Sequence, residues 1–566
     1  MGDGTPSVSA AGRAGAAAVL AAAILAGWRL FPAFSSQIVG IGAVDHYGTL
    51  WTWEQLRLAV AQADPTRLVR SPVLYAPFGM DLARNTGLNL LDAALALPFA
   101  AVGRFPAHNL GMLTPLVLNG LAAAWIARRR SRHPEAPWLV AIAAALGAYP
   151  LYELVEGRPA QALVAPALLA LDALLPAPGA RLGRAVPTGL LIALAGVGYW
   201  FYGLFLGLVA LVVGLSSPRA RPALGAALVA LLVVSPVLAR FAAGWSGTPG
   251  LRGGAGSPLI LHSFQPVLGV VVAEVGDVLV GTQRAVSLAL VLGVGLALRR
   301  RDVGRAAVVV LALALAVGPT VYAFGAAWPS PAWIVLEHLV PPLSRLWHPS
   351  RALVLLVGVG VLGLAEAPRA LRLGLVALGL AEAVAAGLLP LPTWDPGVDA
   401  ADRCLARGEG IVLDLPFGSS QRPLWSQVVH GRPIAGGMHE GAPEFQAPEA
   451  VALRETPGYR ALLVAAEGGR GDGHVPPGAL DELGALGFTQ VVLRRDQVPA
   501  EPAFLRRRVD AALGGLLGAP VYADARATVW SPWGPAPSCE GIEPDEGPAA
   551  PTRERWVRTL GTWPTR

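Results

Sequence analysis

Long apolar runs, separated by short polar segments, constrain the fold of this sequence more than any other feature. The first run is Ala14–Phe34, and eleven more follow before residue 390: Leu88–Val102, Leu110–Ala127, Trp138–Tyr152, Ala162–Leu175, Val186–Trp200, Phe201–Leu215, Ala223–Phe241, Val286–Leu298, Ala306–Ala327, Ala352–Ala365 and Leu371–Leu389. With 54% hydrophobic and 14% charged residues, the chain has too much apolar surface for one water-soluble core. Runs of this kind can cross a bilayer, so the sequence predicts a polytopic α-helical membrane protein.

The basic residues indicate the orientation of these runs. All 44 of them are Arg, and they gather in short clusters between runs: Arg128–Arg132, Arg181 with Arg184, Arg219 with Arg221, Arg299–Arg305, and Arg369 with Arg372. Clusters of this size are typical of cytoplasmic loops and do not form the single basic patch of a nucleic-acid surface. We therefore expect a multi-pass membrane protein with these clusters in the cytoplasm and no nucleic-acid partner. The absence of Lys and the bias towards Ala, Gly, Pro and Arg indicate a GC-rich genome, and hence the inner membrane of a bacterium.

The number of crossings depends on two segments near the N-terminus. The first run is either a cleaved signal peptide or an uncleaved helix, and its continuation through Phe34 favours the helix. Leu88–Val102 and Leu110–Ala127 can make only one crossing between them if the first loop is exported and Arg128–Arg132 is cytoplasmic. A tilted or re-entrant segment, or an N-terminus outside, would satisfy this condition. The sequence therefore predicts eleven or twelve transmembrane helices.

The same orientation places the polar loops on the outer face. These are the first loop, residues 35–87, then Glu153–Gln161, Ala242–Arg284 and Trp328–Arg351. Within the first loop, Leu50–Leu58 mixes aromatic and polar residues and predicts a helix lying in the membrane interface.

The chain changes character after Leu389. Strand-like segments at Gly410–Leu415 and Phe488–Leu493 surround a helical stretch at Leu480–Leu486. We expect a membrane domain at residues 1–389 and an extracytoplasmic α/β domain at residues 390–566. Both cysteines, Cys404 and Cys539, lie in this tail, where either a disulfide or two buried thiols would fit.

Several enzyme motifs are absent from the sequence. We find no P-loop with its Lys, no His/Cys metal-ligand spacing, no Gly-x-Ser-x-Gly elbow and no dinucleotide fingerprint after a strand. An ATP-driven pump is therefore not expected.

Short motifs in the exported segments carry a resemblance to a known superfamily. They are Asp45 after the first helix, Tyr75–Leu82, the stretch Glu156–Gln161, the loop Pro342–Arg351, Asp414-Leu415-Pro416, and His430–Ile434. Together they resemble the bacterial membrane glycosyltransferases of the GT-C superfamily over most of the chain.

This resemblance implies an inverting transfer of a sugar from a polyprenyl-phosphate donor. The acceptor would be a lipid, a glycan or a protein on the outer face of the membrane, with membrane lipids as further partners. By position, Asp45 resembles the loop acid that activates the acceptor or helps to hold a divalent metal. His46 departs from the commoner acidic pair, which leaves the metal open.

Transfer from a phosphate leaving group needs a base and cations that stabilise the developing charge. Asp45 is the candidate base, and Glu156 and Asp81 are the candidates for a second or acceptor-side acid. The candidate phosphate ligands are Arg158, Arg345, His348 and Arg351. We expect Asp45 to face one outward cavity together with these cations, beside an apolar groove for the polyprenyl chain.

Each assignment has a structural alternative. Asp45 could cap a helix, the arginines could be interfacial anchors, and Glu153 and Glu156 could be a solvated loop edge. The rival functions are a transporter or flippase of lipid-linked substrates, favoured by Asp92, Asp172 and Glu382 inside apolar runs, and a non-catalytic membrane scaffold.

Overall fold

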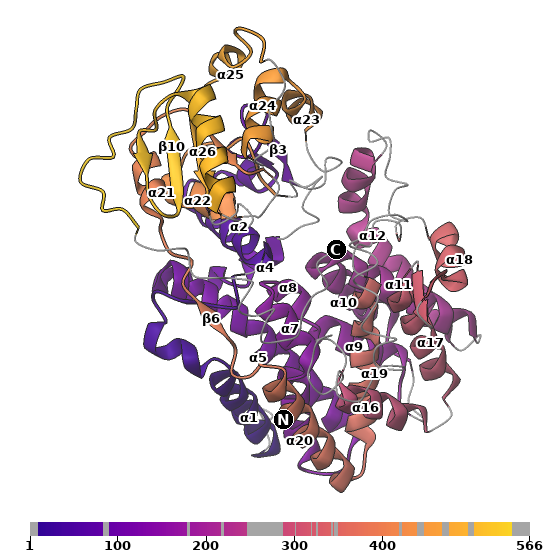
Figure 1. Cartoon of the computed structure of the whole chain (residues 1–566). Helices are drawn as coiled ribbons and strands as arrows, with labels where there is room; N and C mark the ends of the chain where they lie inside the picture. Colours follow the sequence, from indigo (N-terminus) through magenta and orange to yellow (C-terminus); the bar gives the residue numbers. More distant parts are fainter. Residues whose placement is uncertain are drawn as a thin grey trace. The chain divides into compact units, whose positions relative to one another are not determined.

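A computed structural model of the chain describes residues 10–42, 44–82, 90–177, 182–216, 220–245, 287–299, 302–318, 320–323, 326–340, 343, 349–417, 422–438, 447–466, 475–495 and 503–545. The chain divides into two compact units (Figure 1). Unit 1 comprises Met1–Ile41, Ala94–Trp394 and Val557–Arg566, and unit 2 comprises Gly42–Ala93 and Asp395–Trp556.

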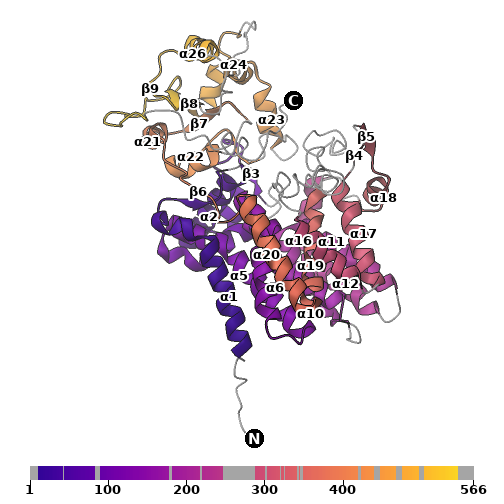
Figure 2. The same ribbon diagram turned by 60° about the horizontal axis from the view of Figure 1, so that its bottom comes forward.

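Unit 1 is built from helices that follow most of the apolar runs (Figures 1 and 2). Its described helices of eight or more residues are α1 (Ala10–Ala26), α5 (Arg104–Arg130), α6 (Ala136–Ala145), α7 (Ala148–Val155), α9 (Ala165–Leu174), α10 (Ala185–Gly198), α11 (Trp200–Ser216), α12 (Arg221–Trp245), α16 (Leu288–Leu298), α17 (Val303–Val317), α18 (Pro331–Leu339), α19 (Leu353–Glu366) and α20 (Arg369–Ala385). The short helix α8 (Pro159–Ala162) lies between α7 and α9.

Helix α19 forms the centre of unit 1. All residues from Leu353 to Ala365 are buried, and the helix contacts α5, α6, α9, α16 and α17. A helix that is apolar on every side belongs inside a bundle. Its glycines allow close packing: a Cβ added at Gly363 would lie 2.2 Å from the carbonyl oxygen of Gly293 in α16. Small residues of this kind permit helix backbones to approach one another in membranes.

The lengths of the helices test the expected crossings only in part. Two segments, Arg104–Arg130 and Ala136–Val155, are long and apolar enough to cross a bilayer, whereas eight other described apolar helices have 10 to 17 residues. Leu88–Val102 is broken into α4 (Leu90–Ala94) and a 3₁₀ segment, Leu97–Val102. At 1.5 Å per residue, neither piece can span ~30 Å of hydrocarbon. The count of eleven or twelve crossings stays a prediction.

Another predicted run ends earlier than expected. The apolar run Ala306–Ala327 was expected to form one membrane-spanning helix. Instead, α17 ends at Val317, and Gly318 takes a φ of 68°. The chain then forms a hairpin of β4 (Thr320–Ala323) and β5 (Ala326–Pro329). The left-handed backbone at Gly318 stops the helix, a conformation that composition alone does not reveal.

The Arg clusters meet at one end of unit 1, which we call the basic end. Glu366, the last residue of α19, accepts hydrogen bonds from Arg130 at 2.8 Å and from Arg305 at 2.7 Å. Arg130 also pairs with Asp172 of α9, and Arg372 pairs with Glu135 at 3.2 Å. Three sequence clusters therefore share one end of the bundle, as the orientation from the sequence requires.

Unit 2 contains a mixed sheet with strand order β7-β8-β10-β9. Strand β7 (Ile411–Leu415) runs parallel to β8 (Phe488–Arg494), whereas β10 (Ala527–Trp530) runs antiparallel to both β8 and β9 (Tyr522–Ala523). Both predicted strands are therefore present. The helices of the tail are α21 (Ala400–Leu405), α22 (Arg422–His430), α23 (Pro448–Arg454), α24 (Pro457–Ala466), α25 (Asp481–Ala485) and α26 (Ala503–Leu517).

The first loop belongs to unit 2, which differs from the expected domain boundaries. Backbone hydrogen bonds join Tyr75 to Gly436 and Ala76 to Ile434, beside the bridge between Ile434 and Val412 of β7. Helix α2 (Val44–Ala61) contacts α22, and Trp51 Nε1 donates to Gln427 Oε1 at 2.8 Å. The expectation of an interfacial helix around Leu50–Leu58 is therefore wrong: the helix exists, but its tryptophans are buried in protein.

The two chain segments that connect unit 1 to the start of α2 and to the tail lie side by side. Strand β1 (Ile38–Val39) pairs antiparallel with β6 (Thr393–Trp394), and Gly40 donates to the carbonyl of Pro392. This short ladder brings residues more than 350 positions apart together, so the loop after α1 and the tail after α20 begin at one place. The proximity explains how two distant pieces of sequence can build one unit.

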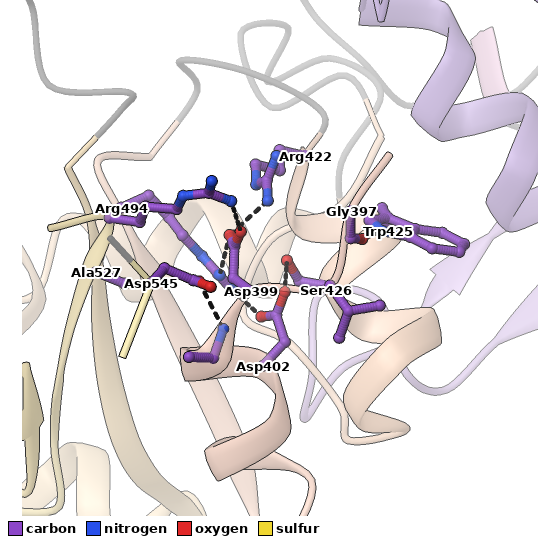
Figure 3. A network of polar contacts seen from close by, with 12 residues as sticks. Gly397, Asp399, Asp402, Arg422, Trp425, Ser426, Arg494, Ala527 and Asp545 are labelled. Atoms are coloured by element: carbon purple, nitrogen blue, oxygen red, sulfur yellow. Dashed lines mark hydrogen bonds and ion pairs between the residues drawn. The ribbon is translucent and has the colours of Figure 1, made fainter. Parts of the chain in front are cut away.

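Buried charges in unit 2 form a network around Arg494 (Figure 3). Its guanidinium lies 2.7 Å from Asp402, 3.0 Å from Asp414 and 3.7 Å from Asp399, while Arg422 also pairs with Asp399. Cys404 and Cys539 form a disulfide with a Cα–Cα distance of 4.8 Å, inside the ~7 Å that such a bridge allows. Of the two alternatives in the sequence, the structure has the bridge.

Candidate functional site

The turn between α7 and α8 positions three charged residues at the end of unit 1 opposite the basic end. Helix α7 closes with Gly157 at a φ of 86°, and backbone hydrogen bonds run from Gly157 to Leu154 and from Arg158 to Glu153. These two bonds form a Schellman motif, which requires a left-handed residue and therefore favours glycine. Pro159 then opens α8, where its missing N–H costs nothing. The motif turns Arg158 back over the last turn of α7.

Arg158 is held by two carboxylates. Its guanidinium lies 3.2 Å from Glu153 and 3.7 Å from Glu156. The Glu153 side chain is only 3% exposed, so the expectation that Glu153 belongs to a solvated loop edge is wrong. Because an unpaired buried carboxylate is costly, Arg158 and Glu153 stabilise each other.

Tyr199 holds the second arginine of this site. Arg351 lies in a 3₁₀ turn, Pro349–Ala352, directly before α19. Its Nη1 donates to the hydroxyl of Tyr199 at 2.7 Å, and its Cζ lies 4.9 Å from the centre of the Tyr199 ring. Tyr199 is the extended residue between α10 and α11, so its side chain can leave the bundle wall at the break between the two helices.

Two further tyrosines connect these elements. The hydroxyls of Tyr149 and Tyr202 are hydrogen-bonded to each other. The Tyr202 hydroxyl also lies 2.9 Å from the carbonyl oxygen of Gln161, and the Tyr149 hydroxyl lies 3.3 Å from that of Arg351. Each phenol has one proton, so one tyrosine donates to the other and the second donates to its carbonyl. We call the set formed by Tyr149, Glu153, Glu156, Arg158, Tyr199, Tyr202 and Arg351 the tyrosine–arginine cluster.

The cluster and the basic end lie at opposite ends of α19. Arg351 precedes the first turn of this helix and Glu366 is its last residue. A 14-residue helix is ~21 Å long, so the two charged layers are separated by about that distance. Between them α10 exposes an apolar stripe of Val186, Leu190, Leu194 and Val197, each at least 38% exposed. Such a stripe suits hydrocarbon better than water.

Arg351 has no carboxylate within ion-pairing distance among the residues that the structure describes. The charges of Glu153 and Arg158 still reach it, one attracting and the other repelling. A partly buried cation bonded only to a neutral phenol retains most of its capacity to bind an anion. Arg158 differs, because its charge is already balanced by carboxylates.

An apolar pocket adjoins the cluster at Tyr149. It has a cavity volume of about 90 Å³ and is bounded by α6, α7, α16, α19 and α20. Tyr149 and Ser287 are the polar residues of a lining that otherwise consists of Ala, Gly, Leu, Val and Pro. The Tyr149 side chain therefore connects an apolar pocket to the charged cluster.

The structure brings some of the predicted site residues together. Glu156, Arg158 and Arg351 all belong to the cluster. Asp45 lies in the first turn of α2, and Asp81 pairs with Arg70 across strands β2 (Arg70–Ser71) and β3 (Met80–Asp81). Both acids belong to unit 2, so a cavity shared by Asp45 and the arginines stays a prediction. Arg345 and His348 lie outside the described residues.

Metal ligands were left open by the sequence. Within the described part of the chain, no group of three or more His, Cys, Asp or Glu side chains is arranged to hold a metal ion. The tyrosine–arginine cluster is made of arginines, phenols and carboxylates.

The three tyrosines are functional candidates that sequence reasoning missed. Each lies beside a break in a helical run: Tyr149 after Gly147, and Tyr199 and Tyr202 on either side of the start of α11. Tyrosine near the end of an apolar run usually marks a membrane interface, so its position in the sequence does not by itself indicate these hydrogen bonds. The signal available in the sequence was a Tyr close to a Gly that interrupts an apolar run, as Tyr149 is to Gly147.

Two kinds of comparison with known proteins give no match. No protein-family model matches the chain, and no curated protein is similar to it in sequence.

A solved structure shares its fold. The chain superposes on the arabinofuranosyltransferase AftD from Mycobacteria with a TM-score of 0.53 and 16% identity, covering 93% of this chain and 40% of that one. An oligosaccharyltransferase, AglB from Archaeoglobus fulgidus, aligns with a TM-score of 0.45 and 13% identity over 85% of this chain and 69% of that one. The chain thus spans less than half of the arabinofuranosyltransferase. It shares the fold of this arabinofuranosyltransferase over the part that it covers, in line with the resemblance that the sequence motifs carry.

Proposed function

We propose that this protein is a membrane glycosyltransferase that transfers a sugar from a polyprenyl-phosphate donor to an extracytoplasmic lipid, glycan or protein acceptor. The observation that carries the proposal is Arg351, a cation without a carboxylate partner in the described chain, next to an apolar pocket that ends at Tyr149. A donor of this kind has a phosphate for the arginine and a hydrocarbon chain for the pocket. The shared fold with AftD supports the same class of reaction.

The residues of the cluster can supply part of the chemistry. As the bond between the sugar and the phosphate breaks, negative charge grows on the phosphate, and Arg351 can stabilise it. Tyr199 keeps the guanidinium in place through its hydroxyl and its ring. The acceptor hydroxyl loses a proton to a base, for which Asp45 is our candidate, and a single displacement inverts the anomeric carbon.

The orientation of the protein in the membrane is also part of the proposal. Positive-inside loops favour the basic end at the cytoplasm, which assigns the tyrosine–arginine cluster to the outer face. The disulfide in unit 2 supports an oxidising compartment for the tail.

A transporter is less well supported. Two of the three charges inside apolar runs that favoured this rival have structural partners: Asp172 pairs with Arg129 and Arg130, and Glu382 accepts hydrogen bonds from the first amides of α16. Carboxylates occupied in this way lock helices together, which leaves them unavailable as a carrier site for a substrate.

The proposal is tested with the full chain in lipid nanodiscs, supplied with polyprenyl-phosphate sugars and membrane extracts as acceptors. Arg351→Gln should lower transfer by ~100-fold or more, because it removes the charge that stabilises the leaving phosphate. Arg369→Gln, at an exposed Arg of the basic end, is the matched control and should keep wild-type activity. Asp45→Asn should lower turnover by ~100-fold if this acid removes the acceptor proton.

Mass spectrometry of lipid-linked intermediates and surface glycans in a deletion strain would identify sugar and acceptor. Full activity of Arg351→Gln would refute the proposed phosphate site. If the deletion strain instead accumulated lipid-linked sugars on the inner leaflet and still made every glycosidic linkage, the protein would be a transporter.

A further inference from the structure

Glu153 and Glu156 are placed where they do not stabilise their own helix. They occupy the C-terminal turn of α7 and its cap, where the helix dipole is negative. Carboxylates are disfavoured at this end, whereas cations are favoured. Helix stability therefore does not explain two acids at this position. Their role is better inferred from their effect on the neighbouring arginines.

Glu153 acts on both arginines of the cluster. It pairs directly with Arg158 at 3.2 Å, and its charge also attracts the Arg351 guanidinium. The four formal charges of Glu153, Glu156, Arg158 and Arg351 cancel. An incoming phosphate at Arg351 therefore meets a nearby buried anion that competes for the same cations.

The proposed reaction changes the charge of the phosphate, and this inference rests on that function. The acceptor oxygen bonds to the anomeric carbon, the bond from that carbon to the phosphate oxygen breaks, and the acceptor proton goes to the base. The donor is a phosphodiester with a single negative charge. The product is a phosphomonoester, whose second ionisation near pH 6 gives it ~1.5 to 2 negative charges at pH 7.

We propose that Glu153 is a positioning residue that promotes release of the polyprenyl monophosphate product, by competing with it for Arg158 and Arg351. Repulsion by a fixed carboxylate grows with the charge of the ligand, so it weakens the product more than the donor. Glu153 takes no part in bond making. It keeps Arg158 in place before the donor arrives and weakens the binding of the product afterwards. Product release is a step that often limits turnover.

Glu153→Gln tests the proposal, because it keeps the shape of the side chain and an oxygen for Arg158 while removing the charge. We expect the inhibition constant of polyprenyl monophosphate to fall on the order of ten-fold, with a smaller change in the KM of the donor. The maximal rate should fall where release limits turnover. Glu153→Asp retains the charge and should restore the wild-type ratio of product inhibition to donor KM.

Glu156→Gln is the control for Glu153→Gln, because it removes the same charge from the neighbouring carboxylate. Its carboxylate lies 3.7 Å from Arg158 and its side chain is more exposed, so its effect should be weaker. An unchanged ratio in Glu153→Gln, with normal folding and transfer, would overturn the role in release and leave Glu153 as a support for Arg158 alone. Wild-type protein that neither transfers sugar nor binds polyprenyl monophosphate would refute the proposed function itself.

Discussion

Arg494 and its carboxylate partners show how single residues define the interior of unit 2. Burial alone would raise the pKa of Asp399, but Arg422 and Arg494 more than offset this effect and hold its pKa below the usual range. Burial raises the pKa of Asp414, even though Arg494 lies beside it. Arg494 thus helps to offset the cost of burial at Asp399, but it offsets that cost only in part at Asp414. These ion pairs connect α21, β7 and β8.

His430, at the end of α22, is the residue whose titration should be measurable. Its ring is buried, its Nδ1 accepts a hydrogen bond from the backbone N–H of Arg432 at 3.0 Å, and burial together with Arg494 and Arg432 holds its pKa well below 6.5. The unfolded chain binds a proton near pH 6.5 and the folded chain does not. Stability from this residue is therefore present above pH 6.5 and is lost as the pH falls towards the folded pKa.

His430→Asn should reduce this loss, because Asn keeps an acceptor for Arg432 and does not titrate. Between pH 7 and pH 5 the stability of the wild type should fall with a slope of up to ~1.4 kcal/mol per pH unit more than that of the variant. Hydrogen exchange of unit 2 in the full-length protein provides the measurement. Asp414 changes the stability in the opposite direction as the pH falls, and it does so equally in both proteins. The difference between their two slopes therefore reports on His430 alone. His133→Asn, at an exposed site, should match the wild type; equal slopes in all three would refute the prediction.

At the scale of elements, the helices of unit 1 are joined by polar contacts at their ends and by close backbone packing between them. Asn119 of α5 illustrates the first kind of contact: it donates to Ala162 and accepts from the N–H of Ala165, at 2.8 Å each. These groups are left unpaired where α8 ends and α9 begins, and a side chain from another helix satisfies them. A break in a helix inside a membrane requires such a partner.

Glu366 should have a large effect on the stability of the bundle. Its carboxylate pairs with Arg130 of α5 and Arg305 of α17, whose side chains are 2% and 1% exposed. Glu366→Gln leaves two buried guanidinium groups without their shared charge, which should lower the free energy of unfolding by ~3–5 kcal/mol. Thermal unfolding in detergent is the measurement. The exposed pair of Glu455 and Arg460 provides the control, since Glu455→Gln should cost less than ~1 kcal/mol.

At the scale of the whole molecule, unit 2 depends on two distant parts of the chain. Segment 42–93 supplies α2 and the Tyr75 turn, and segment 395–556 supplies the sheet. The Tyr75 hydroxyl donates to the carbonyl of Met438 at 2.5 Å, across 363 residues of sequence. The tail therefore packs as one unit with the segment that carries Asp45 and Asp81.

The disulfide joins residues 135 positions apart in the tail, and its removal should weaken unit 2. Cys404→Ser with Cys539→Ser should lower its stability by ~2–5 kcal/mol, because the unfolded tail gains freedom. Differential hydrogen exchange of the full-length protein checks this. In cells, wild-type protein should resist thiol alkylation until it is reduced, whereas Cys404→Ser should expose a reactive Cys539. Thiols that react without reduction in the wild type would argue against an exported tail.

The amino-acid sequence by itself determined the class of this protein and most of its helices. Apolar runs and Arg clusters act locally, through burial in hydrocarbon and through charge at the membrane surface, so they are readable without a structure. Strand patterns in the tail and the candidates Arg158 and Arg351 were found in the same way.

Only the tertiary structure decided which distant groups meet. The contact between Tyr149 and Arg351 spans 202 residues, and that between Trp51 and Gln427 spans 376. Such pairs depend on how helices pack and on where backbone breaks occur, which no local periodicity encodes. For the same reason, Glu153 looked like a solvated acid in sequence: its burial comes from the Schellman turn that folds Arg158 back onto α7.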